Sequence, residues 1–238
     1  MNKFILTGII ALTAGSLLAT DSSPKDDVKA AAKALGDNYS WHSAVTSPTG
    51  GNARFRPGPT DGKTAGGTTW LSTTRGTNVT DAVLAAGGKG AAKMEDGWQS
   101  LSEMADDDSG GGFNRRTMLA RMLQNFKAPA TEAAELADKA KDLAKSDDAL
   151  AGDLTEEGAK SMLRFGPPGG GGPEISDAKG SVKFWLKDGK LVKYEFHVQG
   201  SIDFNGNTRD VDRTTTVELK DVGKTTVTVP DDAKKKLS

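Results

Sequence analysis

The two histidines are the residues of this chain best suited to acid–base chemistry, because imidazole exchanges a proton near neutral pH. His42 follows Trp41, and His197 lies in SVKFWLKDGKLVKYEFHVQG, residues 181–200. A nucleophilic triad needs a histidine between a carboxylate and a nucleophile. The chain has no G-x-S-x-G pattern and no cysteine. We therefore predict no enzyme activity and no catalytic residue, with a secreted hydrolase using His42 or His197 as the least favoured alternative.

The candidate metal-binding and phosphate-binding motifs lack the residues or the spacing that such sites need. Two histidines cannot form a three-histidine zinc site. In a calcium loop starting at Asp106, the position that needs a glutamate is Thr117. GPTDGKT, residues 58–64, has three residues between its glycines where a phosphate loop has four. The net charge of -1 provides no field to attract nucleic acid. The sequence predicts no metal, no cofactor and no nucleic-acid partner.

The N-terminus has the composition of an export signal. Lys3 precedes the uncharged apolar run FILTGIIALTAGSLLA, residues 4–19, whose length suits a signal peptide better than a membrane-spanning helix. An uncleaved anchor is the alternative. LLAT, residues 17–20, resembles a lipobox in which Thr20 replaces the lipid-bearing cysteine. We expect a periplasmic or secreted protein with no stable transmembrane segment after signal removal.

Changes in periodicity divide the rest of the chain. We predict a signal peptide over residues 1–20, a polar spacer over 21–27 and a single α+β domain over 28–238. Within that domain we expect a β-rich part at residues 39–104, a helical part at 113–166, a Gly/Pro linker at 166–173 and a β-meander at 180–230. KTTVTV, residues 224–229, is the expected last strand. This order excludes an alternating βαβ architecture.

Four helical segments are expected. DDVKAAAKALG, residues 26–36, begins with acidic residues and ends at a glycine. A helix from residue 113 places one apolar face on Phe113, Met118, Leu119, Met122, Leu123 and Phe126, and Pro129 ends or kinks it. A third helix, residues 131–145, carries a stripe of Leu136, Ala140, Leu143 and Ala144. Thr155 caps the fourth, in residues 153–166.

The hairpin at Asp188 and Gly189 has two possible registers. A two-residue turn would set Phe184 beside Lys193. A three-residue loop with a bulge at Gly189 instead pairs Phe184 with Val192 and Val182 with Tyr194. We favour this bulge because it gathers the apolar residues on one face and puts His197 on the other. That apolar face consists of Val182, Phe184, Leu186, Val192, Tyr194, Phe196 and Val198.

Three stretches resemble the superfamily of bacterial envelope carriers that includes LolA and the mycobacterial LppX/LprG lipoproteins. They are LTEEGAKSML at residues 154–163, VKFWLKDGKLVKYEFHVQG at 182–200 and VTVPDDAKKKL at 227–237. The resemblance implies a strongly curved antiparallel sheet, a half-barrel, with helices packed on its concave face and acyl chains sheltered between them. No ligand residue of that family maps onto this chain.

We therefore expect a non-enzymatic envelope protein whose partner is a lipid or an acylated protein. A hydrophobic groove would be lined by Phe184, Leu186, Val192, Tyr194, Phe196 and Val198 from the strands and by Met118, Leu119, Met122 and Phe126 from the helix. The alternative is a structural or interaction protein of the same fold in which these residues fill the core.

Overall fold

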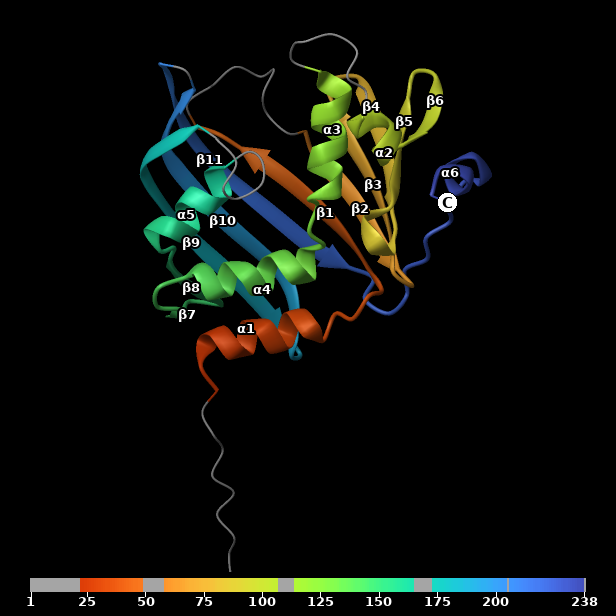
Figure 1. Ribbon diagram of the computed structural model, residues 1–238. Coiled ribbons are helices and arrows are strands. Elements are labelled where there is room, and N and C mark those ends of the chain that lie inside the picture. The colour runs from red at the N-terminus through yellow and green to blue at the C-terminus, as the bar shows by residue number, and fades with distance from the viewer. Residues whose placement is uncertain (1–21, 49–57, 107–113, 165–172, 205, 238) are drawn as a thin grey trace, which may run out of the picture.

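The structure is a computed structural model that describes residues 22–48, 58–106, 114–164, 173–204 and 206–237. The predicted signal peptide and nearly all of the predicted Gly/Pro linker lie outside these residues, as does Phe113. Three features follow from the described part: one curved sheet, a helical layer on its concave face, and a C-terminal segment on its outer face (Figure 1).

One antiparallel sheet of eleven strands forms the framework. The strands are β1 Tyr39–Thr46, β2 Thr60–Ala65, β3 Thr68–Arg75, β4 Asn78–Leu84, β5 Gly90–Met94, β6 Gly97–Ser100, β7 Ala144–Ser146, β8 Ala149–Asp153, β9 Glu174–Lys187, β10 Lys190–Phe204 and β11 Asn207–Lys220. Their order is β6-β5-β4-β3-β2-β1-β11-β10-β9-β8-β7. The pairing of β1 with β11 joins the β-rich part to the C-terminal meander. The sheet is curved and open, which confirms the expected half-barrel (Figure 1).

The helices divide between the two faces of the sheet. They are α1 Pro24–Lys33, α2 Leu101–Ala105, α3 Arg115–Gln124, α4 Pro129–Lys139, α5 Glu156–Leu163 and α6 Asp231–Lys236, and a short 3-10 turn spans Ala86–Gly88. Helices α1, α3, α4 and α5 lie over the concave face, as expected, whereas α6 lies outside it next to β5 and β6 (Figure 1).

The starts of the helices follow from local capping. The Thr155 hydroxyl accepts a hydrogen bond from the Gly158 backbone nitrogen at 3.0 Å, as predicted. Helix α2 was not predicted, although Ser100 and Glu103 form the capping box that could have revealed it. Pro129 occupies the first turn of α4, where its missing N–H costs nothing, and α3 has already ended at Gln124.

Two predicted elements were wrong. The third helix ends at Lys139, and the chain then forms the β7–β8 hairpin, so Leu143 and Ala144 do not continue a helical stripe. Residues 224–229 do not form a strand. Strand β11 already has β10 on one side and β1 on the other, and therefore offers no free edge to a following strand. The segment crosses the outer face instead.

The hairpin register was also wrong, although a bulge is present. Asp188 and Gly189 both have positive φ and form a two-residue turn that pairs Leu186 with Leu191. Val192 is the extra residue, because Lys193 is the next residue to pair, with Trp185. The bulge at Val192 restores the apolar alignment: Phe184 faces Tyr194 and Val182 faces Phe196. Leu191, rather than Val192, is the buried residue at this end of β10.

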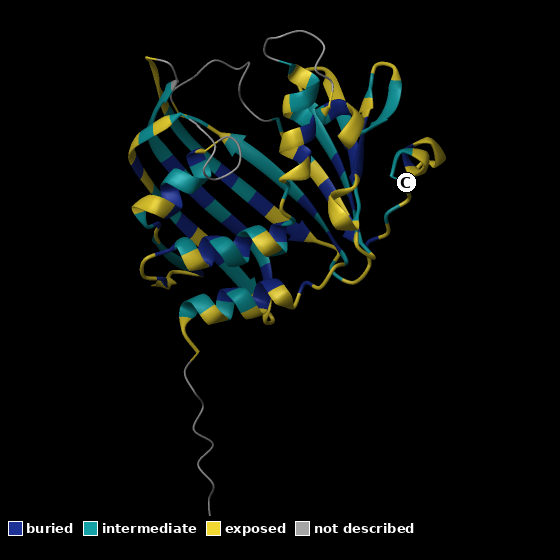
Figure 2. Cartoon of the chain, viewed as in Figure 1, coloured by how far each residue is buried: buried dark blue, intermediate teal, exposed yellow. Residues whose placement is uncertain are grey.

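Buried residues form a main core on the concave side and a small one outside. The main core lies between the sheet and helices α1 to α5, where Figure 2 shows buried positions along the strands. Trp41 reaches this core by lying against Gly62 on the neighbouring strand, where any Cβ atom would collide with the indole. On the outer face, Ala233 of α6 is buried, as are Val83 and Ala91 of the strands.

Candidate functional site

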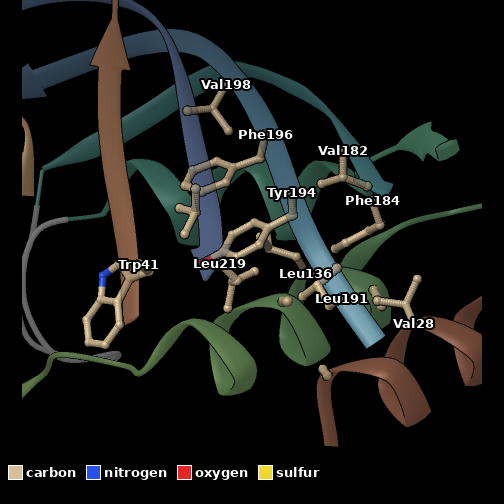
Figure 3. Packing of buried hydrophobic residues seen from close by; sticks show 14 of the residues in the cluster. Val28, Trp41, Leu136, Val182, Phe184, Leu191, Tyr194, Phe196, Val198 and Leu219 are labelled. Atoms are coloured by element: carbon tan, nitrogen blue, oxygen red, sulfur yellow. The ribbon is translucent and has the colours of Figure 1, made fainter. Parts of the chain in front are cut away.

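Large side chains on the concave face of the sheet oppose small ones on the helices. Phe184, Tyr194 and Val198 are each 0% exposed, and Phe196 is 4% exposed. Figure 3 shows them along β9 and β10, with Leu136 of α4 beneath. Half of the buried residues on these helices are alanines: Ala31 and Ala32 from α1, Ala120 from α3, Ala133 and Ala137 from α4, and Ala159 from α5. The helical layer therefore contributes little apolar surface per helix.

A carboxyl group lies inside this apolar layer. The Tyr194 hydroxyl donates a hydrogen bond to Oε2 of Glu132 at 2.5 Å. Part of Glu132 reaches the surface, but burial of its carboxyl group raises the pKa, and the hydrogen bond from Tyr194 offsets this only in part. Burial beside Glu132 raises the pKa of Tyr194 well above its ordinary value. The pair is therefore a protonated phenol bonded to a carboxyl group that holds its proton to a higher pH than usual.

Arg213 of β11 is the second buried charged group on the concave face. Its Nη2 donates to the Met162 carbonyl at the end of α5, at 2.7 Å. Its Nε is buried and has no hydrogen-bond partner among the described residues. Burial lowers the pKa of Arg213, while the nearby Glu132 raises it. The guanidinium thus lies near a carboxyl group without forming an ion pair with it within the described part of the chain.

A pocket of about 180 Å³ lies between α4 and α5. Its lining consists of Lys127, Glu132, Glu135, Leu136, Lys139, Ser161 and Met162. Glu135 accepts ion pairs from Lys127 at 2.5 Å and from Lys139 at 3.8 Å. This volume is below the usual range for drug-sized ligands, roughly 300–1,000 Å³. The pocket can hold a small polar group, but not an acyl chain.

A larger pocket of about 600 Å³ lies on the outer face, away from the aromatic residues of the core. It is formed by Ser40, Asp61, Gly62, Lys63, Trp70 and Ser72 of the sheet and by residues 226–228 of the C-terminal segment. None of the ten predicted groove residues lines it, so it does not correspond to the hydrophobic groove expected from the sequence.

Both histidines lie on the outer face, and each contacts one aspartate. His42 Nδ1 is 2.8 Å from Oδ1 of Asp61, and His197 Nε2 is 2.8 Å from Oδ1 of Asp212. His197 lies between the buried Phe196 and Val198, which confirms its predicted place opposite the apolar face. Within the described chain, no hydroxyl group bonds to the second nitrogen of either ring. These pairs therefore lack the nucleophile of a catalytic triad.

The described residues also contain no group of three or more His, Asp or Glu side chains placed to hold a metal ion. None of the helices that the structure describes is both long and apolar enough to cross a membrane.

The structure separates the ten predicted groove residues into three groups. The first is buried and consists of Phe184, Tyr194, Phe196 and Val198. The second is partly buried and consists of Leu186, Val192, Leu119 and Phe126, with Phe126 stacked on Trp41 at 6.1 Å between ring centroids. The third is Met118 and Met122, which are 48% and 58% exposed.

The predicted apolar face of α3 was therefore wrong in part. Ala120 and Leu123 are its buried residues, and Thr117 bonds to the Met104 carbonyl of α2. Met118 and Met122 point away from that contact. Sequence reasoning missed Glu132 and Arg213, which are the buried charged groups nearest the aromatic residues. A lone glutamate in an alanine-rich helix carries no signal of its burial.

Comparisons with known proteins were made on the sequence and on the structure. No family model and no curated protein matches the sequence. The structure is similar to LprF from Mycobacterium bovis, with 12% sequence identity and a TM-score of 0.41 over 88% of this chain and 96% of LprF. It is also similar to the lipoprotein LppX from Mycobacterium tuberculosis, with 13% identity and a TM-score of 0.40 over 87% of this chain and 97% of LppX.

Proposed function

We propose that this protein is an exported, non-enzymatic envelope protein that binds a lipid, a lipoprotein acyl chain or another hydrophobic ligand between the sheet and its helices. The observation that carries the proposal is the pairing of an aromatic sheet face with alanine-rich helices. Phe184, Tyr194 and Phe196 offer a continuous apolar surface, and the helices that cover it bury few large side chains of their own.

Helix α5 is an element that a ligand can displace at a small cost in buried surface. It buries only Gly158, Ala159 and Leu163. Losing the burial of one alanine and one leucine side chain costs about 3–4 kcal/mol. An acyl chain that buries twelve methylene groups in its place gains about 10 kcal/mol, at about 0.8 kcal/mol each. The apolar terms favour the ligand by about 6 kcal/mol before the cost of association, which is about 4–15 kcal/mol, so binding into a nearly filled core needs the full length of the acyl chain.

The surface beneath α5 is shaped to accept a chain. Leu163 packs against Gly200 of β10, where an added Cβ atom would lie 2.8 Å from Leu163 Cδ1. Val182 and Val198 of the sheet are buried nearby. With Leu163 lifted, the missing side chain at Gly200 leaves a shallow apolar channel next to the buried Val198 and Ala178.

The first test is whether the mature protein carries or takes up lipid. We expect organic extraction followed by mass spectrometry to recover lipid from protein purified without detergent, and we expect uptake of a fluorescent fatty acid. An empty extract together with no uptake would refute the proposal and favour a structural protein with a filled core. The complete burial of Phe184 and Tyr194 supports that alternative.

A second test fixes α5 to the sheet. The chain has no cysteine, so Leu163→Cys with Gly200→Cys introduces one defined pair. The double substitution also removes the Leu163 atom that an added side chain at residue 200 would meet. Once mass spectrometry shows the disulfide, oxidation should block fatty-acid uptake and a reductant should restore it. Undiminished uptake by the oxidised protein would show that ligand does not enter under α5. The two single variants serve as controls.

A further inference from the structure

Positive charge is in excess around the pocket between α4 and α5. Lys127 and Lys139 lie at its wall, and both contact the carboxylate of Glu135. Arg213 does not line the pocket, but its Nη2 is bonded to the carbonyl of Met162, which does. These three cations face two carboxyl groups. The carboxylate of Glu135 contacts both lysines. The carboxyl group of Glu132 is hydrogen-bonded to Tyr194.

Arg213 is the group whose bonding is least complete. Among the described residues its hydrogen bond is to a neutral carbonyl, and the buried Nε has no partner there. A buried guanidinium without an anion is costly, since desolvation disfavours charge unless hydrogen bonds and an opposite charge compensate. Two adjacent N–H groups of an arginine match the two oxygens of a carboxylate or a phosphate. Arg213 thus has an unused donor, and its hydrogen bond to Met162 joins it to the wall of the pocket.

We infer that the α4–α5 pocket binds the anionic head group, a carboxylate or a phosphate, of an amphiphilic ligand whose acyl chain lies beneath α5. This inference rests on the proposed function. The pocket volume of about 180 Å³ suits a group of a few heavy atoms. Arg213 pairs across the sheet with Val198, one of the buried valines beneath α5. If the head group lies at Arg213, the acyl chain attached to it lies beside the apolar channel.

The experiment compares ligands of equal chain length that differ in charge. Displacement of a bound fluorescent fatty acid is measured with laurate, with dodecanol and with inorganic phosphate. We expect laurate to bind about tenfold more tightly than dodecanol, because one charge-assisted hydrogen bond contributes roughly 1.5–3 kcal/mol and 1.4 kcal/mol is a factor of ten. Arg213→Met and Lys139→Met should bring this ratio close to one without weakening dodecanol.

Lys160→Met is the matched control. Lys139 and Lys160 are each 28% exposed, and each pairs with a glutamate one helical turn earlier, but Lys160 does not line the pocket. The control should keep the wild-type ratio. If Arg213→Met fails to fold, the partly exposed Lys139 still provides the test.

The remaining outcomes separate the inference from the function on which it rests. Equal affinity for laurate and dodecanol in the wild type overturns the head-group site and leaves the binding of hydrophobic ligands standing. If neither laurate nor dodecanol binds, the proposed function is refuted as well. Binding of inorganic phosphate without binding of laurate would show that the pocket binds a free anion, and would refute the inference that the anion is the head group of a lipid.

Discussion

The buried carboxyl group of Glu132 makes a sharp prediction about the pH dependence of stability. Its folded-state pKa is raised from the ordinary value of 4.5, chiefly by burial. Above pH 4.5 the unfolded chain releases this proton while the folded chain retains it, so the folded state binds more protons. The free energy of unfolding must then fall as pH rises, until the pH passes the folded-state pKa.

The size of the effect follows from this linkage. Each unit between the two pKa values corresponds to about 1.4 kcal/mol, so the slope approaches about -1.4 kcal/mol per pH unit within the window. Glu132→Gln removes the titration, while its amide oxygen can still accept the bond from Tyr194, which is 2.5 Å long in the wild type. The variant should therefore gain stability relative to the wild type as pH rises above 4.5.

Urea unfolding followed by tryptophan fluorescence, at constant ionic strength from pH 4.5 to 8, measures this difference. Glu156→Gln is the control: the hydrogen bond to Lys160 lowers the pKa of Glu156, so its pH window lies below 4.5 and this variant should run nearly parallel to the wild type over the measured range. Parallel curves for the wild type and Glu132→Gln over the whole range would refute a desolvated carboxyl group at this position.

Three further predictions concern packing and the ligand site. Gly62→Ala should cost about 1–3 kcal/mol in urea unfolding and change the tryptophan emission, because the new Cβ displaces the indole that lies on β2; wild-type stability would show that the indole does not need that contact. Tyr194→Phe should cost about 1–3 kcal/mol by leaving the Glu132 carboxyl without its donor, and a loss below about 0.5 kcal/mol would contradict the buried bond. Met118→Ser with Met122→Ser should alter stability by no more than about 0.5 kcal/mol, since both side chains are exposed. The same variant should leave fatty-acid uptake unchanged, because the proposed acyl site lies beneath α5; reduced uptake would move the ligand site to α3.

Local patterns predicted much of the fold. The period-two alternation in residues 180–220 identified the long strands, and the buried set Val182, Phe184, Tyr194, Phe196 and Val198 needed only that alternation. The same alternation placed His197 on the outer face. The Thr155 cap located the start of α5, because a cap depends on atoms within one turn of the chain. Helix α1 begins at Pro24, inside the predicted polar spacer, where Ser23 caps it.

Errors arose where distant residues decide the conformation. Residues 224–229 have a strand-like composition, but the position beside β11 is taken by β1, nearly two hundred residues earlier in the chain. The bulge at Val192 rather than Gly189 follows from the alignment of Phe184 with Tyr194 across two strands. The outward position of Met122 depends on the contact of α3 with α2, and α2 itself was not predicted.

The sequence by itself determined the α+β class, the long C-terminal strands and which of their faces is apolar, because these depend on short-range periodicity. The candidate site was decided only by the tertiary structure. Glu132, Tyr194 and Arg213 are separated by up to eighty residues, and each is an ordinary residue in its own segment. They meet because the curvature of the sheet and the packing of α4 and α5 bring them into one poorly solvated layer, and burial there gives a carboxyl group and a guanidinium properties that no local pattern encodes.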